Sequence, residues 1–373
     1  MTINKNNNHN YLSGKSKIIH RNNFFNYQRL IYIVIVSLFI LIGVYNYRYV
    51  EQHCKYEYVD VIEKKFIKLN ESDELIGPVY LYDRFKDRHE WLIQKCSEYK
   101  LNVKNNGTNN EPNAWEYLIN DKYKLVWCNV FKAASSSWFY NFNLLAGYDR
   151  NYLDNTNETP VSVARKKYPR PSVKELLDAL KDHLSFIIVR HPFERLVSAY
   201  RDKFASDSYN SFFRPLGKKI IQATRPNYKI NKSYPPTFEE FVRYILCQWE
   251  FGGEINEHWT SIHKLCTPCL VDFDLILKVE TLKEDQDYLI NLANIQNIIG
   301  ATWKNSSKNQ TTETVTRKYF SQLTKVHFSR LIEMFKLDFE LFGYSEKKYK
   351  TYAKKTNKNV PYKCERVRLY INK

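Results

Sequence analysis

The sequence predicts an α/β domain in which helices flank a central, mostly parallel sheet, preceded by a single transmembrane helix. Short apolar runs alternate with helical patterns between 115 and 349, an order that produces parallel strands joined by helices. A stretch from 30 to 47 carries no charged residue, which is sufficient length to cross a thin bilayer. The chain has 373 residues, of which 43% are hydrophobic, so it can bury a sizeable core.

Three runs are strand candidates because they are short, apolar and rich in β-branched residues. They read KLVWCNVF at 124–131, LSFIIV at 184–189 and DLILKVETL at 274–282. The first two runs each lead directly into a helical pattern. We expect one helix over 136–146, ended by Gly147, and another that begins at Pro192, a residue favoured at the first helical position.

Two further helices are marked by their N-terminal residues. TFEEFVRYIL begins with a capping box formed by Thr237 and Glu240. The segment at 324–343 has the pattern of one long helix, with Thr324 as N-cap and Gly343 as its end. Together with the strands, these helices complete the predicted α/β domain.

The uncharged stretch at 30–47 is predicted to be a signal anchor. The 29 residues before it contain five Lys or Arg and no acidic residue, which places the N-terminus in the cytosol and the rest of the chain in the lumen. A cleaved signal peptide is the alternative, but the apolar run is long and no small-residue cleavage site precedes Arg48.

The predicted organisation follows from these features. We divide the chain into a cytosolic tail (1–29), a transmembrane anchor (30–47), a lumenal stem and linker (48–114), a catalytic domain (115–349) and a basic C-terminal tail (350–373). A helix is expected in the stem around 80–99. The tail is predicted to be either a loosely ordered solvated segment or a grip for an acidic glycan.

The net charge of +17, from 57 Lys and Arg against 40 Asp and Glu, indicates a polyanionic partner. The lumenal topology excludes a nuclear role in nucleic-acid binding and leaves acidic polysaccharides and the membrane surface as partners.

Sequons and cysteines agree with a lumenal location. Six N-x-S/T sequons follow the anchor and are candidates for glycosylation: Asn70, Asn106, Asn157, Asn231, Asn305 and Asn309. All seven cysteines also follow it, and in an oxidising compartment we expect disulfides, although spacing does not reveal their pairing. Because the count is odd, Cys54 is a candidate for a bridge between two chains of a homodimer.

The segment KAASSSW has the parts of an anion-binding turn. Lys132 follows a strand, and three serines open a helix whose N–H groups attract negative charge. The Walker A pattern is absent. On this segment alone, the alternative is that the serines cap the helix and Lys132 is a solvated charge.

A second strand end strengthens the interpretation as an anion site. Arg190 directly follows the run at 184–189, and Ser198 lies off the apolar stripe of the next helix. Arginine suits phosphate recognition, although an ion pair with Glu194 is an alternative role. Two basic strand ends that open onto helix N-termini suggest a nucleotide with phosphates at both ends.

Several segments together resemble the Golgi carbohydrate sulfotransferases, in the group of chondroitin/dermatan 4-O- and HNK-1 sulfotransferases. VRHPFERLVSAYRDKF resembles the segment that binds the 3′-phosphate of the donor in this family. NEHWTSIHKLCTPCLVDFDLILKVETLKED, TFEEFVRYIL and YFSQLTKVHFSRLIEMFKLDFELFGYS also resemble family blocks. The resemblance covers 125–345 in matching order.

The resemblance implies a P-loop-like sulfotransferase domain in a type II Golgi membrane protein. The donor would be PAPS (3′-phosphoadenosine 5′-phosphosulfate), with no metal. By position, the residues implied for the 5′-phosphosulfate are Lys132, Ala133, Ala134, Ser135, Ser136 and Ser137. Arg190 and Ser198 would hold the 3′-phosphate. The chain departs from the family's PKxxxTxW-like run, with Phe131 for proline and Ser136 for threonine.

The predicted reaction needs a stabilised leaving oxygen and a base. Lys132 would stabilise the leaving oxygen of a loose sulfuryl-transfer transition state, with help from Ser136. His258 is the favoured base for the acceptor hydroxyl, with Glu257 as a second candidate. A structural role for His258 is the alternative, and His191 is expected to be a helix N-cap.

The segment HKLCTPC offers at most three zinc ligands, so one disulfide or two separate ones are expected there instead. The predicted activity is transfer of sulfate from PAPS to a glycan hydroxyl, with N-acetylgalactosamine of chondroitin or dermatan as acceptor. A catalytically inactive lumenal glycan-binding protein and a kinase-like phosphotransferase are the alternatives. The absent Walker A motif disfavours the kinase.

Overall fold

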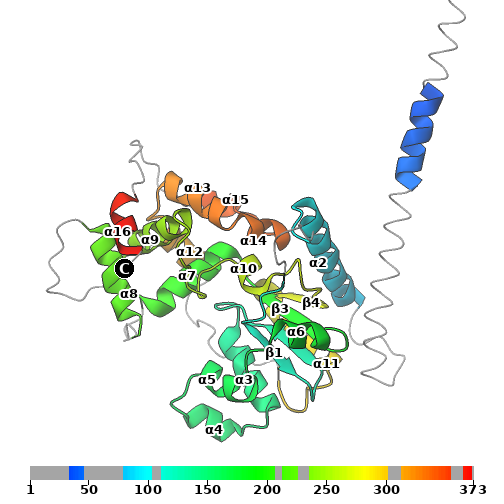
Figure 1. Cartoon of the computed structure of the whole chain (residues 1–373), viewed down its shortest axis with the longest axis horizontal. Helices are drawn as coiled ribbons and strands as arrows, with labels where there is room; N and C mark the ends of the chain where they lie inside the picture. Colours follow the sequence, from blue (N-terminus) through cyan, green and yellow to red (C-terminus); the bar gives the residue numbers. More distant parts are fainter. Residues whose placement is uncertain are drawn as a thin grey trace, which may run out of the picture. The chain divides into compact units, whose positions relative to one another are not determined.

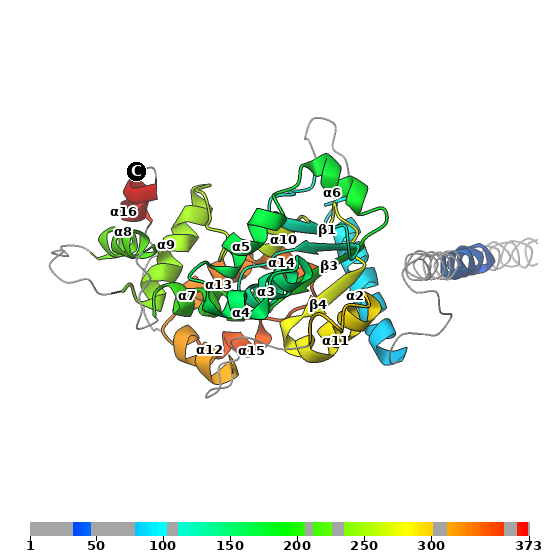
Figure 2. The same cartoon turned by 90° about the horizontal axis from the view of Figure 1, so that it is seen from below.

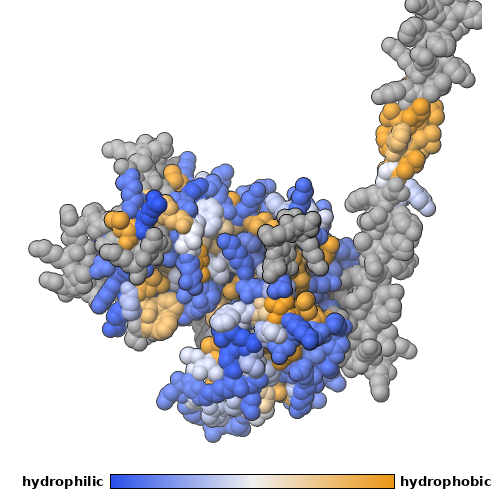
Figure 3. All heavy atoms as spheres, in the orientation of Figure 1, coloured by the Kyte–Doolittle hydropathy of each residue, from blue (hydrophilic) through white to orange (hydrophobic). Residues whose placement is uncertain are grey.

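The computed structural model describes residues 33–45, 79–102, 111–205, 212–225, 235–300, 312–353 and 364–371. The chain divides into two compact units, 1–64 and 65–373. In the first unit, residues 33–45 form a helix inside the predicted anchor, and its surface is hydrophobic (Figure 3). Within the described ranges, no helix is both long and apolar enough to span a bilayer. Residues 30–32 and 46–47 of the predicted anchor lie outside those ranges.

The second unit is built on a four-stranded mixed sheet in the order β1-β2-β3-β4. The strands are β1 (Tyr117–Asn120), β2 (Leu125–Cys128), β3 (Leu184–Val189) and β4 (Leu275–Lys278). β1 runs antiparallel to β2, whereas β2, β3 and β4 are mutually parallel. All three predicted strands are therefore confirmed, and the short antiparallel β1 is an addition at the edge.

Helices surround this sheet and extend beyond it (Figure 1). Those packed with the sheet or beside it are α2 (Val79–Glu98), α3 (Ser135–Leu145), α4 (Arg150–Asn155), α5 (Pro160–Lys167), α6 (Val173–Ala179), α10 (Ile262–Cys266) and α11 (Leu282–Leu292). β2 and β3 are buried along their whole length, which explains why both sequences read as unbroken apolar runs rather than as alternation.

The remaining helices form a second hydrophobic core beside the sheet. They are α7 (Pro192–Lys203), α8 (Arg214–Thr224), α9 (Phe238–Glu250), α12 (Thr312–Phe320), α13 (Lys325–Met334), α14 (Lys336–Leu341), α15 (Lys347–Lys350) and α16 (Glu365–Ile371). Both views place α8, α9 and α16 together, away from the sheet (Figures 1 and 2). Aromatic rings fill this core, and Phe193 of α7 contacts Phe320, Phe328 and Phe339.

Predicted helix starts are confirmed at three places. Pro192 begins α7, Thr237 and Glu240 form a reciprocal capping box at α9, and Thr324 caps α13. The single long helix predicted over 324–343 is wrong, because it breaks at Phe335 into α13 and α14. Beyond the break, the buried Asp338 carboxylate accepts hydrogen bonds from the first amides of α10, Ile262 N–H at 2.7 Å and His263 N–H at 3.0 Å.

Two segments outside 115–349 belong to the second unit. The helix expected around 80–99 is α2, and it packs against β4, α11 and α14. At the other end, α16 packs against α8 and α9. The compact unit therefore draws elements from the regions assigned to the stem and to the C-terminal tail.

Three disulfides join distant parts of this unit. Cys96 of α2 is bonded to Cys269, Cys128 of β2 to Cys266, and Cys247 of α9 to Cys364. The segment HKLCTPC thus takes part in two separate disulfides, one of the outcomes expected from the sequence. The described ranges hold no cluster of three potential metal ligands, and Cys54 lies outside them.

Candidate active site

The two predicted anion-binding turns lie next to each other at the carboxyl edge of the sheet. β2 and β3 are adjacent and parallel, with Cys128 opposite Ile187. Lys132 follows β2 and Arg190 follows β3, so both cations emerge at the same edge. The Arg190 guanidinium Nη1 donates to the Lys132 carbonyl oxygen at 3.3 Å. Two sites that are 58 residues apart in sequence therefore meet.

The Lys132 turn takes a left-handed backbone conformation without any glycine. Lys132 has φ of 69° and Ala134 has φ of 60°, a region that costs a non-glycine residue on the order of 1–2 kcal/mol. Ala134 is the N-cap of α3 and has no side chain to cap the helix. The first N–H groups of α3 have no intrahelical acceptor, so they are available to an anion.

The three serines of this turn differ in exposure. Ser136 is exposed, Ser135 is half-buried and Ser137 is buried. Ser136 can therefore present its hydroxyl to a bound donor more readily than Ser137. Ala133, which is also buried, donates its N–H to the Val130 carbonyl at 3.1 Å and tightens the turn.

Lys132 is largely buried and pairs with a carboxylate that the sequence did not reveal. Its Nζ lies 3.1 Å from Asp202 Oδ2, at the end of α7. Burial lowers the pKa of Lys132, Asp202 opposes this effect, and the nearby cations Lys203 and Arg190 add to it. The ammonium is therefore less strongly protonated than a solvated lysine.

Within the part of the chain that the structure describes, one N–H donor of the Arg190 guanidinium has no hydrogen-bond partner. Its Nε is buried and makes no hydrogen bond, although Glu194 Oε2 lies 3.7 Å away. The predicted ion-pair alternative is thus present, but it leaves the guanidinium incompletely satisfied, as a phosphate-binding arginine would be. Tyr349 donates its hydroxyl to Glu194 Oε1 at 2.7 Å and fixes that carboxylate.

Ser198 lies on the same face of α7 as Glu194, because helical residues four positions apart are neighbours. Ser198 is half-buried and lies about two turns along α7 from Arg190. Joint binding of a 3′-phosphate by Arg190 and Ser198 stays a prediction.

His191 is the N-cap of α7, as expected. Its Nδ1 accepts the Phe193 N–H at 3.2 Å, and its Nε2 lies 3.1 Å from the Ser345 carbonyl, to which it donates. Burial lowers its pKa to about 4. With both nitrogens occupied, His191 is unsuited to be the catalytic base.

The structure brings His258 to the Lys132 turn. Its ring lies 4.5 Å from the Phe131 ring, centroid to centroid. Asn256 Oδ1 accepts from the His258 backbone N–H at 3.0 Å and lies 2.8 Å from Nδ1. Nδ1 therefore carries the proton, and Nε2 keeps the lone pair that a base needs.

The electrostatic environment of His258 is cationic. Burial, followed by Lys203 and Lys132, lowers its pKa to about 3, so the ring is neutral. A donor anion would offset these cations and make the ring more basic. Glu257 is more exposed, and its Oε1 lies 3.4 Å from His258 Nδ1.

Arg195 connects the loop that contains Lys132 to the loop that contains His258. This role was not predicted from the sequence. It is almost fully buried and donates to the carbonyl oxygens of Phe131, His258 and Thr260. Its carbonyl partners lie in two other segments of the chain, so no local sequence pattern marks this role. Asn256 and Asp202 were also missed, because their partners are distant or belong to the backbone.

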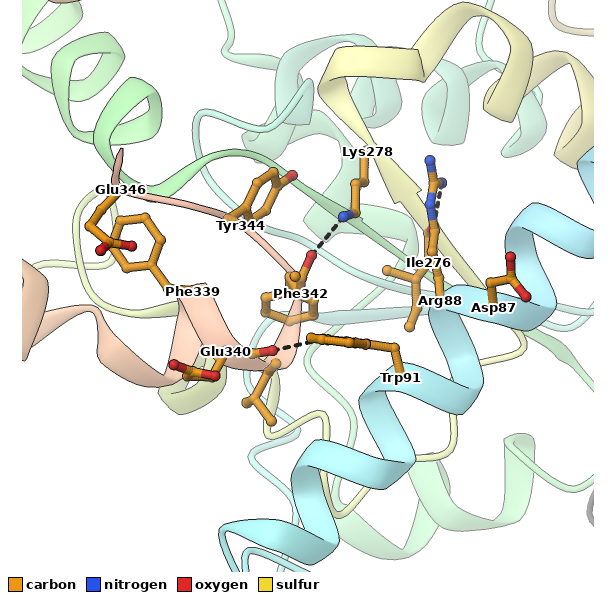
Figure 4. Close-up of a pocket in the computed structure, with 12 residues that line it drawn as sticks. Asp87, Arg88, Trp91, Ile276, Lys278, Phe339, Glu340, Phe342, Tyr344 and Glu346 are labelled. Atoms are coloured by element: carbon orange, nitrogen blue, oxygen red, sulfur yellow. Dashed lines mark hydrogen bonds between the residues drawn. The ribbon is translucent and has the colours of Figure 1, made fainter. Parts of the chain in front are cut away.

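A separate cavity of about 420 Å³ lies between α2, β4 and the segment that follows α14 (Figure 4). Trp91, Lys278 and Tyr344 form part of its wall. Lys278 Nζ donates to the Phe342 carbonyl at 2.6 Å, and burial lowers the pKa of this lysine to about 8. No predicted site residue lines this cavity.

Of the six sequons, only Asn157 falls in the described ranges, where it is exposed between α4 and α5. The hydroxyl of its sequon threonine, Thr159, accepts the Ser162 N–H at 3.2 Å and caps α5. The other sequons lie outside those ranges: Asn70, Asn106, Asn231, Asn305 and Asn309.

Comparison with known proteins agrees with this geometry. Residues 115–345 match the sulfotransferase family. The chain is 36% identical over 248 residues to carbohydrate sulfotransferase 11 of Rattus norvegicus, covering 64% of this chain and 70% of that protein. It is 28% identical to carbohydrate sulfotransferase 8 of Mus musculus, covering 74% and 70% of the two chains. It is 29% identical to carbohydrate sulfotransferase 10 of Xenopus laevis, covering 70% and 76%.

No solved structure gives a significant match to this chain. The sequence match spans more than half of the 373 residues and includes both strand-end turns. This chain therefore belongs to the sulfotransferase family, in the group of the carbohydrate sulfotransferases, which are PAPS-dependent enzymes.

Proposed function

We propose that this chain transfers a sulfuryl group from PAPS to a hydroxyl of an acidic glycan, with N-acetylgalactosamine of chondroitin or dermatan as the acceptor. The observation that carries the proposal is the contact between the Lys132 and Arg190 turns at neighbouring strand ends. One basic turn for each of the two anionic ends of the nucleotide matches the chemistry of this donor. The net charge of +17 supports an acceptor rich in carboxylates and sulfates.

The 5′ end of the donor would lie at the start of α3. The backbone N–H groups from Ala134 to Ser136, with the Ser136 hydroxyl, would surround the phosphosulfate. The N–H groups of Ala133 and Ser137, also predicted from the sequence, already donate to the carbonyls of Val130 and Ala134. Lys132 would approach the oxygen that bridges phosphorus and sulfur. That oxygen gains negative charge as its bond to sulfur breaks, and the ammonium of Lys132 would stabilise it.

The 3′ end would be held by Arg190 and Ser198. The unsatisfied Nε of Arg190 offers a charge-assisted hydrogen bond to a phosphate oxygen. Because Arg190 and Ser198 flank the first turns of α7, the helix N-terminus would add its partial positive charge.

The acceptor hydroxyl would lose its proton to His258. The hydrogen bond from His258 Nδ1 to Asn256 leaves the lone pair on Nε2. Binding of the anionic donor would raise the pKa of the His258 ring. Glu257 is the second candidate for the base. The two candidates are separated by the kcat values of His258→Gln and Glu257→Gln. If His258→Gln keeps full kcat and Glu257→Gln loses it, Glu257 is the base.

We also infer a type II topology, with the anchor at 30–47 in the Golgi membrane and the catalytic domain in the lumen. The five cations before the anchor and the three disulfides after it support this topology. Protease protection of the lumenal domain in intact Golgi vesicles is the expected result, and digestion without detergent would contradict it.

The test of function uses radiolabelled PAPS and the detergent-solubilised full chain. Label should pass to a glycan from a panel of desulfated chondroitin, dermatan and glycoprotein glycans, with strongest transfer to N-acetylgalactosamine acceptors. Glycan binding with neither label transfer nor a PAPS-dependent thermal shift would instead identify an inactive glycan-binding protein. The observation that supports this alternative is the Lys132 turn, which adopts a left-handed backbone without any glycine.

A further inference from the structure

A single carboxylate oxygen bridges two lysines at the Lys132 turn. Asp202 Oδ2 lies 3.1 Å from Lys132 Nζ and 3.0 Å from Lys203 Nζ. Asp202 is the penultimate residue of α7, the helix whose opposite end follows Arg190. One helix thus connects the proposed 3′-phosphate site to the lysine of the proposed 5′ site.

The surroundings of Lys132 are otherwise cationic. The Lys132 side chain is 20% exposed and Asp202 is 46% exposed. Lys203 and Arg190 disfavour the charged form of Lys132, and His258 is close enough for its pKa to be lowered by Lys132. The Asp202 carboxylate pairs with Lys132 and favours its protonation.

Asp202 is itself held in its ionised form. Burial alone would raise the pKa of this carboxyl, but Lys132 and Lys203 outweigh burial and hold the pKa below its ordinary value. A full negative charge therefore lies beside Lys132 before any donor arrives.

The donor brings a second anion to the same ammonium. If the phosphosulfate reaches Lys132 as proposed above, the Asp202 carboxylate and the donor oxygens become neighbours of like charge. Such neighbours repel each other in a partly buried site. Asp202 must then release Lys132, at least in part, and it can do so because Lys203 remains as its partner.

We propose that Asp202 is a positioning residue that keeps Lys132 charged and held in the donor-free enzyme, and passes it to the donor on binding. The inference rests on the proposed function. It predicts that Asp202 opposes donor binding while supporting the charge of Lys132, two effects that a purely structural residue would not combine.

Asp202→Asn separates these effects because it keeps the shape and removes the charge. PAPS should bind the full-length variant roughly tenfold more tightly than wild type, because one like-charged neighbour is gone. Adenosine 3′-monophosphate, which lacks the 5′ phosphosulfate, should bind both proteins equally. Calorimetric titration with each nucleotide measures the difference.

The pH profile tests the second effect. Activity should require the charged form of Lys132, so kcat/KM falls as pH rises through its pKa. In Asp202→Asn this alkaline limb should move down by about one pH unit, because a nearby opposite charge is lost. In Lys203→Gln it should move up, because a like charge is lost.

Asp178→Asn is the matched control, since Asp178 of α6 pairs through its carboxylate with the exposed Lys181, at 2.6 Å, away from the site. It should leave both nucleotide affinities and the pH profile unchanged, and melting curves should show that all variants are folded. PAPS affinity in Asp202→Asn that equals or falls below that of wild type would overturn the inference. Wild type that binds neither nucleotide would instead refute the proposed function, and the inference with it.

Discussion

The turns at Lys132 and Arg190 end neighbouring parallel strands and both begin a helix, yet they are built differently. At Arg190, the His191 side chain caps α7, Pro192 begins it, and Glu194 supplies a counter-charge one turn away. At Lys132, two residues adopt left-handed conformations, no side chain caps α3, and the counter-charge comes from Asp202, 70 residues later. The Arg190 turn takes its cap and its counter-charge from neighbouring residues, although Ser345 and Tyr349 hold these groups from a distance. The Lys132 turn takes its counter-charge from a residue far along the chain.

This difference suits the two ends of the proposed donor. The 3′-phosphate is unchanged by the reaction, so a rigid local clamp serves it well. The 5′ phosphosulfate changes its charge distribution as the sulfur–oxygen bond breaks, and it needs a group that can follow this change. Lys132 is such a group because its partner Asp202 has an alternative cation in Lys203.

The largest expected effect comes from removing Lys132. Lys132→Ala should lower kcat by about 10³-fold, because the leaving oxygen loses its main electrostatic partner. Rates of label transfer from PAPS measure this loss, and circular dichroism melts should show an intact fold.

Lys124→Ala is the control for Lys132→Ala. Lys124 also has a left-handed backbone, with φ of 51°, and it pairs with Asp182 at 3.0 Å at the opposite end of β2. Its loss should leave kcat unchanged. Wild-type activity in Lys132→Ala would remove Lys132 from the reaction and erase the proposed difference between the turns.

Removing Arg190 should affect binding more than chemistry. Arg190→Ala should raise the apparent KM for PAPS by about 10- to 100-fold, as expected for lost charge-assisted hydrogen bonds. Initial rates at varied PAPS concentration separate KM from kcat. An unchanged donor KM would place the 3′-phosphate elsewhere, and Arg170→Ala, at an exposed site by Trp115, is a suitable control.

Acid should weaken the Arg190 turn through His191. Burial lowers the pKa of His191 to about 4, whereas an unfolded histidine titrates near 6.5. The full stability is therefore present above about pH 6.5 and is lost as pH falls toward 4, by up to about 3 kcal/mol from this group.

His191→Asn should reduce this acid sensitivity, because asparagine can cap α7 without titrating. Thermal melts between pH 7 and pH 4 measure the slope for both proteins. An equally steep slope in the variant would assign the acid sensitivity to other groups, such as His258 and His327, whose pKa values are also lowered by burial.

The smallest expected effect concerns the strain in the Lys132 turn. Ala134→Gly should stabilise the fold by about 0.5 kcal/mol, since relief of the left-handed conformation exceeds the entropy cost of glycine. Ala133→Gly is the matched control, because Ala133 is buried and is not left-handed. Denaturant unfolding compares the two, and a destabilised Ala134→Gly would mean that the turn is not strained.

Local patterns were enough to predict much of this molecule. The buried strands at 125–128 and 184–189 contain little besides apolar residues, and helix starts at Pro192, Thr237 and Thr324 have strong capping signals. The meeting of Lys132 and Arg190 followed from parallel strands, whose carboxyl ends share one edge of a sheet.

Features that depend on distant contacts were not predictable from local patterns. Arg195 is a buried arginine that donates to three backbone carbonyls, and no sequence pattern marks a carbonyl as a partner. The pairing of Asp202 with Lys132, 70 residues earlier, likewise has no local sequence signal. The break at Phe335 interrupts a regular apolar pattern at a point where tertiary packing outweighs helix propensity.

The disulfides of the segment HKLCTPC have a consequence for how the chain is made. Cys96 can form its disulfide only after Cys269 has been synthesised, 173 residues later. At ordinary rates of synthesis, that interval lasts about 10 to 35 s. During this time the α2 segment exists with an unpaired thiol on a growing chain, so an oxidoreductase could capture it with another cysteine. Correct disulfide pairing in this enzyme therefore depends on the order in which the cysteines are synthesised, as well as on their positions in the folded structure.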